Sequence, residues 1–212
     1  MIVKVCGMRD PDNILAVETV HPDWMGFILW PGSQRYVAAP PTYLPQSPVK
    51  RVGVFVQPSV GDVVRRVSEW NLDLIQLHGN ESAAFCREVK RATCKPLIKA
   101  FSIATVADLL PAADYGDVAD YFLFDTRTPL VGGSGRQFDW RILDAYDGPT
   151  PFLLSGGIGP DDASRLAAFH HPRCIGLDLN SRFETAPALK DAVALQRFIS
   201  QIVTFQKKYP PL

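Results

Sequence analysis

Short apolar runs rich in β-branched and aromatic residues recur along the chain at roughly even intervals. Their length and composition are typical of buried strands. The runs are IVKVC (2–6), WMGFIL (24–29), RVGVFV (51–56), LDLIQL (72–77), PLIKAF (96–101), YFLFD (121–125), PFLLS (151–155) and CIGLDL (174–179). The pattern therefore predicts eight strands.

Most of the segments between these runs have the spacing of amphipathic helices. In segment 58–70 Val63 and Val64 come three and four residues after Val60, and Val67 comes four and three residues after them. Asp10, Asn80 and Pro160 mark three predicted helix starts. Helix is predicted over 10–20, 58–70, 80–92, 103–113, 138–147, 159–169 and 186–205.

Strand followed by helix, repeated along the chain, implies parallel pairing. The second crossover is the exception, because four prolines between Arg35 and Val49 break a regular helix interior. Eight such units with short loops favour a closed (β/α)8 TIM barrel, a single domain over 1–212 with an irregular second crossover. The functional groups of such a barrel belong at the carboxyl ends of its strands.

Composition and charge narrow the classes of function. Hydrophobic residues make up 47% of the chain, charged residues 21%, and the formal net charge is zero, which argues against a nucleic-acid partner. The four cysteines form no C-x-x-C pair, and no His lies at ligand spacing, so neither a metal site nor a disulfide is expected. No apolar run reaches membrane length and the start carries no secretory signal, so we expect a cytoplasmic protein without a membrane partner.

Polar residues stand where several of the predicted strands end. Cys6 ends the first run, Arg35 follows the second, His78 follows the fourth and Asp125 ends the sixth. Because alternate residues of a strand share a face, Asp125 lies in line with Leu123 and is expected at the barrel mouth. The alternative for Cys6 is a small buried hydrophobe, and the alternative for His78 is a hydrogen bond to a loop backbone.

Two glycine-rich stretches favour an anionic ligand: GGSG at 132–135, and SGGIGP at 155–160 before a predicted helix. Glycine lets backbone amides approach an anion closely, and a helix N-terminus favours negative charge. In many barrels a phosphate lies between the loops after strands seven and eight. The predicted phosphate-binding residues are Gly133, Gly135, Gly156, Gly157, Asn180 and Ser181.

Taken together, these motifs resemble the phosphoribosylanthranilate isomerase family of tryptophan biosynthesis. KVCGM resembles the family's opening K-[IV]-C-G motif, and RYV resembles its S-P-R-Y-[IV] segment. LIQLHG, FDTRTPLVGGSGRQFDW and LSGGIGPDD resemble its fourth-, sixth- and seventh-strand signatures, and LDLNSRFETAPALKD resembles its ending. The matches follow the family's order over nearly the whole chain.

The resemblance implies an Amadori rearrangement of a phosphorylated aminoaldose to an aminoketose, with no metal or organic cofactor. It implies that Cys6 is the general base, Asp125 the general acid and Arg35 the ligand of the substrate carboxylate, with His78 in the active site. This chemistry needs a protonated Asp125 and a thiolate at Cys6, so we expect a lowered pKa for Cys6. A monomer and a homodimer are both compatible with the sequence.

Four positions depart from the family pattern. Arg9 stands where Thr is usual and Gln34 where Pro is usual, and Arg182 and Ala188 each replace a glycine. These changes bear on affinity and loop geometry more than on the type of reaction.

Two other functions are weighed against this one. A histidine-pathway aminoaldose isomerase usually pairs aspartates on strands one and five, where this chain has Cys6 and the run PLIKAF. A barrel that only binds a phosphorylated ligand is the non-catalytic alternative. Turnover of freshly made phosphoribosylanthranilate distinguishes them.

Strand alternation makes one further prediction. Lys4 shares a face with Cys6, so it points into the barrel, where a lysine rarely stays unpaired. In a closed barrel the eighth strand neighbours the first, which makes Asp178 the expected partner, within about 4 Å of Lys4. The positive charge of Lys4 is then expected to favour the Cys6 thiolate, whereas the alternative is a lysine that reaches solvent at the bottom of the strand.

Overall fold

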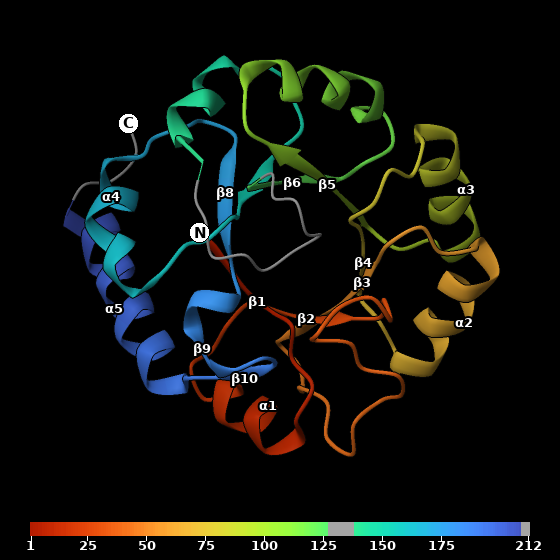
Figure 1. Ribbon diagram of the computed structural model, residues 1–212, viewed down its shortest axis with the longest axis horizontal. Coiled ribbons are helices and arrows are strands. Elements are labelled where there is room, and N and C mark those ends of the chain that lie inside the picture. The colour runs from red at the N-terminus through yellow and green to blue at the C-terminus, as the bar shows by residue number, and fades with distance from the viewer. Residues whose placement is uncertain (127–137, 209–212) are drawn as a thin grey trace.

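All eight predicted strands are confirmed by the computed structural model, which describes residues 1–126 and 138–208. The strands are β1 (Ile2–Cys6), β2 (Trp24–Ile28), β3 (Lys50–Phe55), β4 (Leu74–Leu77), β5 (Leu97–Ile103), β6 (Tyr121–Thr126), β7 (Phe152–Leu154) and β8 (Cys174–Leu179). They pair in parallel in chain order and β8 pairs with β1, so the sheet closes (Figure 1). The predicted TIM-barrel class is therefore confirmed.

Helices surround the barrel on its outer side (Figure 1). The α-helices are α1 (Pro11–Glu18), α2 (Val60–Trp70), α3 (Ala83–Thr93), α4 (Ala163–Ala168) and α5 (Ala192–Lys208). Asp10 caps α1 as predicted, because its side chain accepts a hydrogen bond from the Asn13 N–H. The cap of α3 is Ser82 rather than Asn80, so that predicted start was two residues early.

Three predicted helices are partly or wholly 3-10 helix. These segments are η1 (Val106–Tyr115), η2 (Trp140–Ala145) and η3 (Pro160–Asp162), the last of which precedes α4. Pro111 lies inside η1, where it has no N–H to donate to the preceding turn. Of the other two, η3 is three residues long, which is the usual length of a 3-10 helix, and η2 is six residues long.

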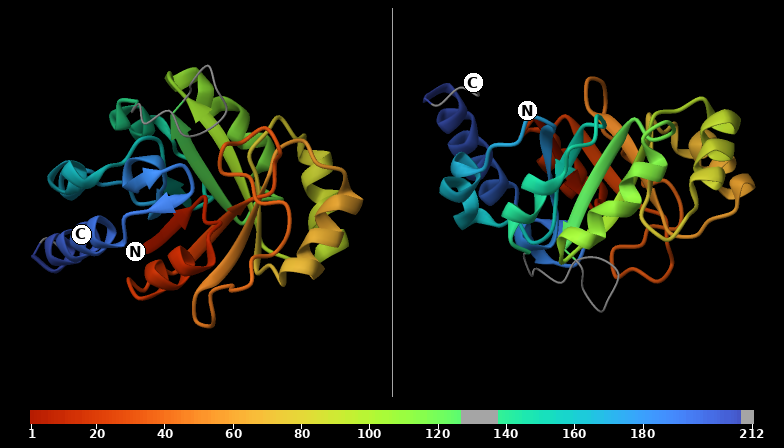
Figure 2. Two further views of the ribbon diagram at one scale, coloured as in Figure 1. Left: turned by 60° about the horizontal axis from the view of Figure 1, so that its bottom comes forward. Right: turned by 90° about the horizontal axis from the view of Figure 1, so that it is seen from above.

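The prediction of helix from residue 186 was wrong at its start. A 3-10 turn and a small hairpin come first: η4 (Ser181–Phe183), β9 (Glu184–Ala186) and β10 (Leu189–Lys190). Pro187 and Ala188 form the turn, and the φ angle of Ala188 is +67°, which a right-handed helix excludes. The hairpin lies beside α1 (Figures 1 and 2).

The second crossover, between β2 and β3, has no helix, as its prolines predict.

Two apolar clusters lie on the two sides of the sheet. The inner cluster fills the barrel with Trp24, Val52, Leu74, Ile98, Ala100, Leu123 and Leu153, and a larger one lies between the strands and the outer helices. Strand alternation sorts the charged residues in the same way, because Lys4 and Asp178 point into the barrel while Lys99 points out of it. The inner face therefore carries buried charge directly below the barrel mouth.

Candidate active site

Cys6 lies at the carboxyl end of β1 and faces into the barrel, as its position in the strand predicts. Its side chain is buried, and Gly26 of the neighbouring strand β2 makes the room for it. A Cβ atom on Gly26 would lie 2.7 Å from the Cys6 Sγ atom and 3.1 Å from the Lys4 Nζ atom. The thiol and the ammonium therefore share one small space beside the Gly26 backbone.

The predicted ion pair inside the barrel is confirmed. Lys4 Nζ lies 2.8 Å from Asp178 Oδ1, and the Lys4 side chain is wholly buried. Ser155 at the end of β7 donates a hydrogen bond of 3.2 Å to the other oxygen, Asp178 Oδ2. Three adjacent strands, β7, β8 and β1, thus contribute one chain of polar contacts that ends below Cys6.

The expectation of a net lowered pKa for Cys6 was wrong. Burial raises the pKa of the Cys6 thiol, and the positive charge of Lys4 offsets only part of that increase. Asp178 adds to the increase, and Lys190 opposes it. The physical reason is desolvation, which the sequence pattern does not quantify, while the predicted direction of the Lys4 effect holds.

Asp125 and His78 meet at the mouth, on β6 and just after β4. His78 Nε2 lies 3.3 Å from Asp125 Oδ2, and Asp125 Oδ1 accepts a hydrogen bond of 2.8 Å from the Thr126 N–H. Both side chains are less than one fifth exposed. The structure therefore brings together the predicted acid and the predicted active-site histidine, so His78 is not simply bonded to a loop backbone.

Gln76 fixes the form of this histidine. The Gln76 side chain lies on the inward face of β4 and is 1% exposed. Its Nε2 atom lies 2.8 Å from His78 Nδ1. An amide nitrogen only donates, so Nδ1 accepts and the proton of a neutral His78 lies on Nε2, facing Asp125. Turning the amide over would bury two unpaired N–H donors in place of one oxygen, because Gln76 Oε1 has no hydrogen-bond partner.

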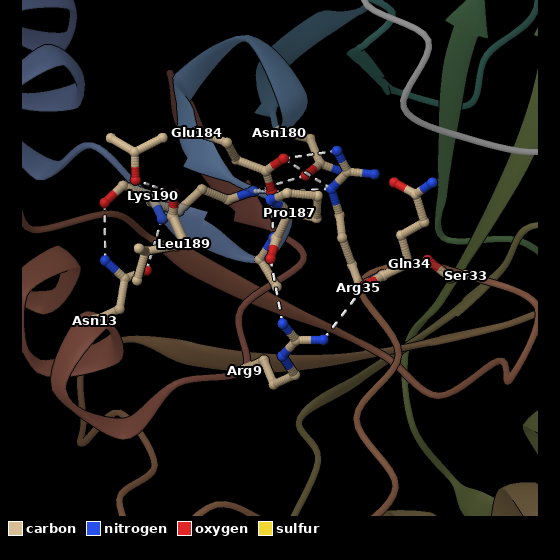
Figure 3. A network of polar contacts seen from close by, with 12 residues as sticks. Arg9, Asn13, Ser33, Gln34, Arg35, Asn180, Glu184, Pro187, Leu189 and Lys190 are labelled. Atoms are coloured by element: carbon tan, nitrogen blue, oxygen red, sulfur yellow. Dashed lines mark hydrogen bonds and ion pairs between the residues drawn. The ribbon is translucent and has the colours of Figure 1, made fainter.

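Arg35 lies in the loop after β2, where it forms an ion pair with Glu184 at the start of β9 (Figure 3). The guanidinium donates through Nε at 2.9 Å and through Nη2 at 2.6 Å. Glu184 Oε1 also accepts a hydrogen bond of 2.5 Å from Lys190 Nζ, which in turn donates to Asn180 Oδ1 at 2.7 Å. Sequence reasoning missed Glu184 and Lys190 as site residues.

Gly7 connects this cluster to the thiol, because it follows Cys6 directly. Its φ angle is +80°, and a Cβ atom there would lie 2.8 Å from Arg35 Cδ and 2.9 Å from Asn180 Oδ1. A side chain at this position would therefore be strained and would displace the cluster. The glycine after the cysteine in VKVCGMRD thus has a structural reason.

Four of the six predicted phosphate-binding residues lie in the part of the chain that the structure describes. Gly156 and Gly157 follow β7 with φ angles of +90° and +70°, and Asn180 and Ser181 follow β8. Gly133 and Gly135 lie outside the described residues. Gly156 has a packing role as well, since a Cβ atom there would lie 2.5 Å from the Thr126 backbone nitrogen.

Neither a metal cluster nor a membrane span is found in the part of the chain that the structure describes. Within residues 1–126 and 138–208, no group of three or more His, Cys, Asp or Glu side chains could hold a metal ion. No helix in the same ranges is long and apolar enough to cross a membrane.

Comparisons with known proteins agree with the family to which the motifs point. The model of the N-(5′-phosphoribosyl)anthranilate (PRA) isomerase family matches residues 3–201. The chain is 52% identical to the N-(5′-phosphoribosyl)anthranilate isomerase of Phocaeicola vulgatus over 95% of this chain and 98% of that protein. It is similar in structure to the phosphoribosyl anthranilate isomerase of Thermotoga maritima, with a TM-score of 0.81, 29% identity and coverage of 96% of this chain and 100% of that one. A further similar structure is an isomerase in complex with reduced 1-(o-carboxyphenylamino)-1-deoxyribulose 5-phosphate, with a TM-score of 0.77, 26% identity and coverage of 96% and 100%.

Proposed function

The chain belongs to the N-(5′-phosphoribosyl)anthranilate isomerase family, and we propose that it converts N-(5-phosphoribosyl)anthranilate to 1-(2-carboxyphenylamino)-1-deoxyribulose 5-phosphate in tryptophan biosynthesis. One observation carries the proposal: two reactive pairs converge on one barrel mouth. They are the thiol of Cys6 beside Lys4, and the carboxyl of Asp125 beside His78. A base and an acid on one face are what an aldose–ketose rearrangement requires.

The first step opens the sugar ring. Asp125 delivers a proton to the ring oxygen, the C1–O bond breaks, and the nitrogen lone pair forms a cationic imine with C1. The His78 Nε2–H group then stabilises the carboxylate that Asp125 becomes, because it already faces Oδ2 at 3.3 Å. The acid therefore has a partner for its charged form.

The second step moves the C2 proton. The imine makes that proton acidic, and the thiolate of Cys6 removes it to give an enolamine, which becomes the ketone when C1 gains a proton and O2 loses one. Lys4 stabilises the thiolate that this step needs. Its partner Asp178 keeps the buried ammonium charged.

Two anionic groups of the substrate need binding partners. Arg35 would bind the carboxylate of the anthranilate ring, because a planar guanidinium matches a carboxylate with paired hydrogen bonds. Backbone amides at Gly156 and Gly157, with Asn180 and Ser181, would bind the phosphate. The ligand named in one of the similar isomerase structures carries both groups.

The test is turnover of freshly prepared N-(5-phosphoribosyl)anthranilate, measured as loss of its fluorescence. We expect conversion by the wild-type protein and nearly complete loss in Asp125→Asn, which cannot deliver the proton. The histidine-pathway aminoaldose is assayed in parallel. Conversion of that substrate alone would replace the proposed function, and conversion of neither would favour a binding protein.

A further inference from the structure

Glu184 joins the site from a distant part of the chain, 149 residues from Arg35. Its carboxylate lies along one side of the guanidinium, where it accepts from Nε and from Nη2. We propose that Glu184 is a positioning residue, which fixes the Arg35 guanidinium so that its other edge, formed by Nη2 and Nη1, is presented to the substrate carboxylate. This inference deepens the proposed function and rests on it.

The geometry of the guanidinium is the first step of the argument. A guanidinium offers one edge formed by Nε and Nη2 and a second edge formed by Nη2 and Nη1. Glu184 occupies the first edge in a bidentate pair, and the close-up shows the remaining nitrogen of Arg35 directed away from Glu184 (Figure 3). Within the described residues no hydrogen bond from Arg35 Nη1 is found, so this nitrogen can donate to a second carboxylate without breaking the first pair.

The second step is that Glu184 is itself held firmly. Its side chain is 5% exposed, and it accepts hydrogen bonds from Lys190 Nζ at 2.5 Å and from the Ala188 N–H at 3.1 Å. Burial alone would raise the pKa of Glu184, but the hydrogen bond from Arg35 and the charge of Lys190 outweigh it, so the net pKa is lowered and the group is a carboxylate. A carboxylate with these partners stays in place when a ligand enters.

The third step concerns the loop that carries Arg35. Arg9 donates to the Gln34 carbonyl at 3.3 Å and to the Pro187 carbonyl at 3.2 Å (Figure 3). It thereby ties the Arg35 loop to the hairpin that carries Glu184. Arg9, one of the four departures from the family pattern, thus links the two segments that carry Arg35 and Glu184, and Gln34 takes part only through its backbone carbonyl.

The opposite role is that Glu184 blocks Arg35 and must leave when substrate binds. In that case, removal of its negative charge would strengthen the binding of a carboxylate. If Glu184 positions Arg35, removal would weaken it. The two roles therefore predict opposite signs for one measurement.

The experiment measures the Kd of two ligands by calorimetry. One is reduced 1-(o-carboxyphenylamino)-1-deoxyribulose 5-phosphate, and the other is the same molecule without the carboxyl group. For Glu184→Gln we expect a Kd about tenfold higher for the first ligand and unchanged, within about twofold, for the second. Glu69→Gln is the matched control, because Glu69 pairs with Arg65 on the exposed surface of α2, and it should change neither value.

Other outcomes distinguish failure of this inference from failure of the proposed function. Equal losses for both ligands would mean a merely structural role, and tighter binding of the carboxylate ligand would mean a blocking role; either result overturns the inference. In an Arg35→Ala background the effect of Glu184→Gln should vanish, and a persisting effect would also overturn it. Wild-type protein that binds both ligands equally would instead overturn the proposed role of Arg35, and absence of turnover would overturn the proposed function.

Discussion

Two buried lysine–carboxylate pairs lie on opposite faces of the same sheet, and each has a cysteine nearby. Inside the barrel Lys4 pairs with Asp178 at 2.8 Å beside Cys6. Outside it Lys99 pairs with Glu81 at 3.3 Å, in the electrostatic neighbourhood of Cys86 on α3. Each set consists of a lysine, a carboxylate and a thiol, so any difference in what the two sets can do must come from their surroundings.

The outer pair is surrounded by backbone. Lys99 Nζ donates to the carbonyls of Gly79 at 2.7 Å and Ala100 at 3.0 Å, and Glu81 accepts from the Gln57 and Gly79 N–H groups. These contacts tie the loops after β3 and β4 to β5, and burial raises the pKa of the Cys86 thiol to about 11. This thiol stays protonated and is a buried residue of α3, so the outer pair is structural.

The inner pair differs from the outer pair in the direction in which the pKa of its lysine is shifted. Burial lowers the pKa of Lys4, but the charges of Asp178 and Cys6 outweigh burial, so its net pKa is raised above 10.5. Burial lowers the pKa of Lys99 as well. The charge and hydrogen bond of Glu81 raise that pKa by less than burial lowers it, so the net pKa of Lys99 is lowered. A lysine that holds its proton firmly, next to a thiol at the barrel mouth, is suited to stabilise a thiolate.

The largest effect should separate the two cysteines. Cys6→Ser is expected to lower kcat/KM by about 10³-fold, because a serine hydroxyl ionises far less than a cysteine thiol near neutral pH and so supplies almost no anionic base. Cys86→Ser should leave kcat/KM within about twofold of the wild type. Steady-state assays of the two purified variants make the comparison, and near-normal activity in Cys6→Ser would remove this residue from the mechanism.

The next largest effect is a difference in activity between substitutions of the two lysines. Lys4→Met and Lys99→Met each leave a buried carboxylate without its charged partner, so each should lower the free energy of unfolding by about 3–5 kcal/mol. Only Lys4→Met should also lower kcat/KM at neutral pH, by about tenfold or more. Urea unfolding and steady-state assays at a temperature where both variants are folded supply the data, and an equal loss of activity in Lys99→Met would contradict the assignment.

A smaller effect concerns the thiol itself. The positive charge of Lys4 favours the thiolate, so Lys4→Met should raise the pKa of Cys6 by about one unit, which corresponds to about 1.4 kcal/mol. Lys99→Met should leave it unchanged. The pH dependence of alkylation at Cys6 by iodoacetamide, followed by peptide mass spectrometry, gives the value directly, and identical profiles in wild type and Lys4→Met would contradict the role of Lys4.

The inner pair could be predicted from the sequence and the outer pair could not. Alternation along β1 and β8, together with closure of the barrel, determines that Lys4 faces Asp178. The partner of Lys99 depends instead on how the loop after β4 folds back over the outer face, which no strand period describes. The ion pair of Arg35 with Glu184 was missed for the same reason, since both residues lie beyond the ends of the barrel strands. Gln76 could have been found, because it lies two residues before His78 on the same face.

The smallest effect is a difference of sign in the dependence of stability on pH. For Lys4 the pKa in the folded protein is above 10.5, so its contribution to stability is fully present below pH 10.5 and is lost as the pH rises through the folded value. For Lys99 the folded pKa is below 10.5, so its contribution improves as the pH rises from the folded value towards 10.5. The difference in unfolding free energy between wild type and Lys99→Met should therefore increase with pH below 10.5, by at most about 1.4 kcal/mol per pH unit. Over the part of this range in which the Cys6 thiol stays protonated in both proteins, the difference between wild type and Lys4→Met should stay level, because Lys4 itself keeps its proton there. Urea unfolding of the three proteins between about pH 8 and pH 10.5 measures both slopes, and equal slopes would mean that the two buried pairs are electrostatically alike.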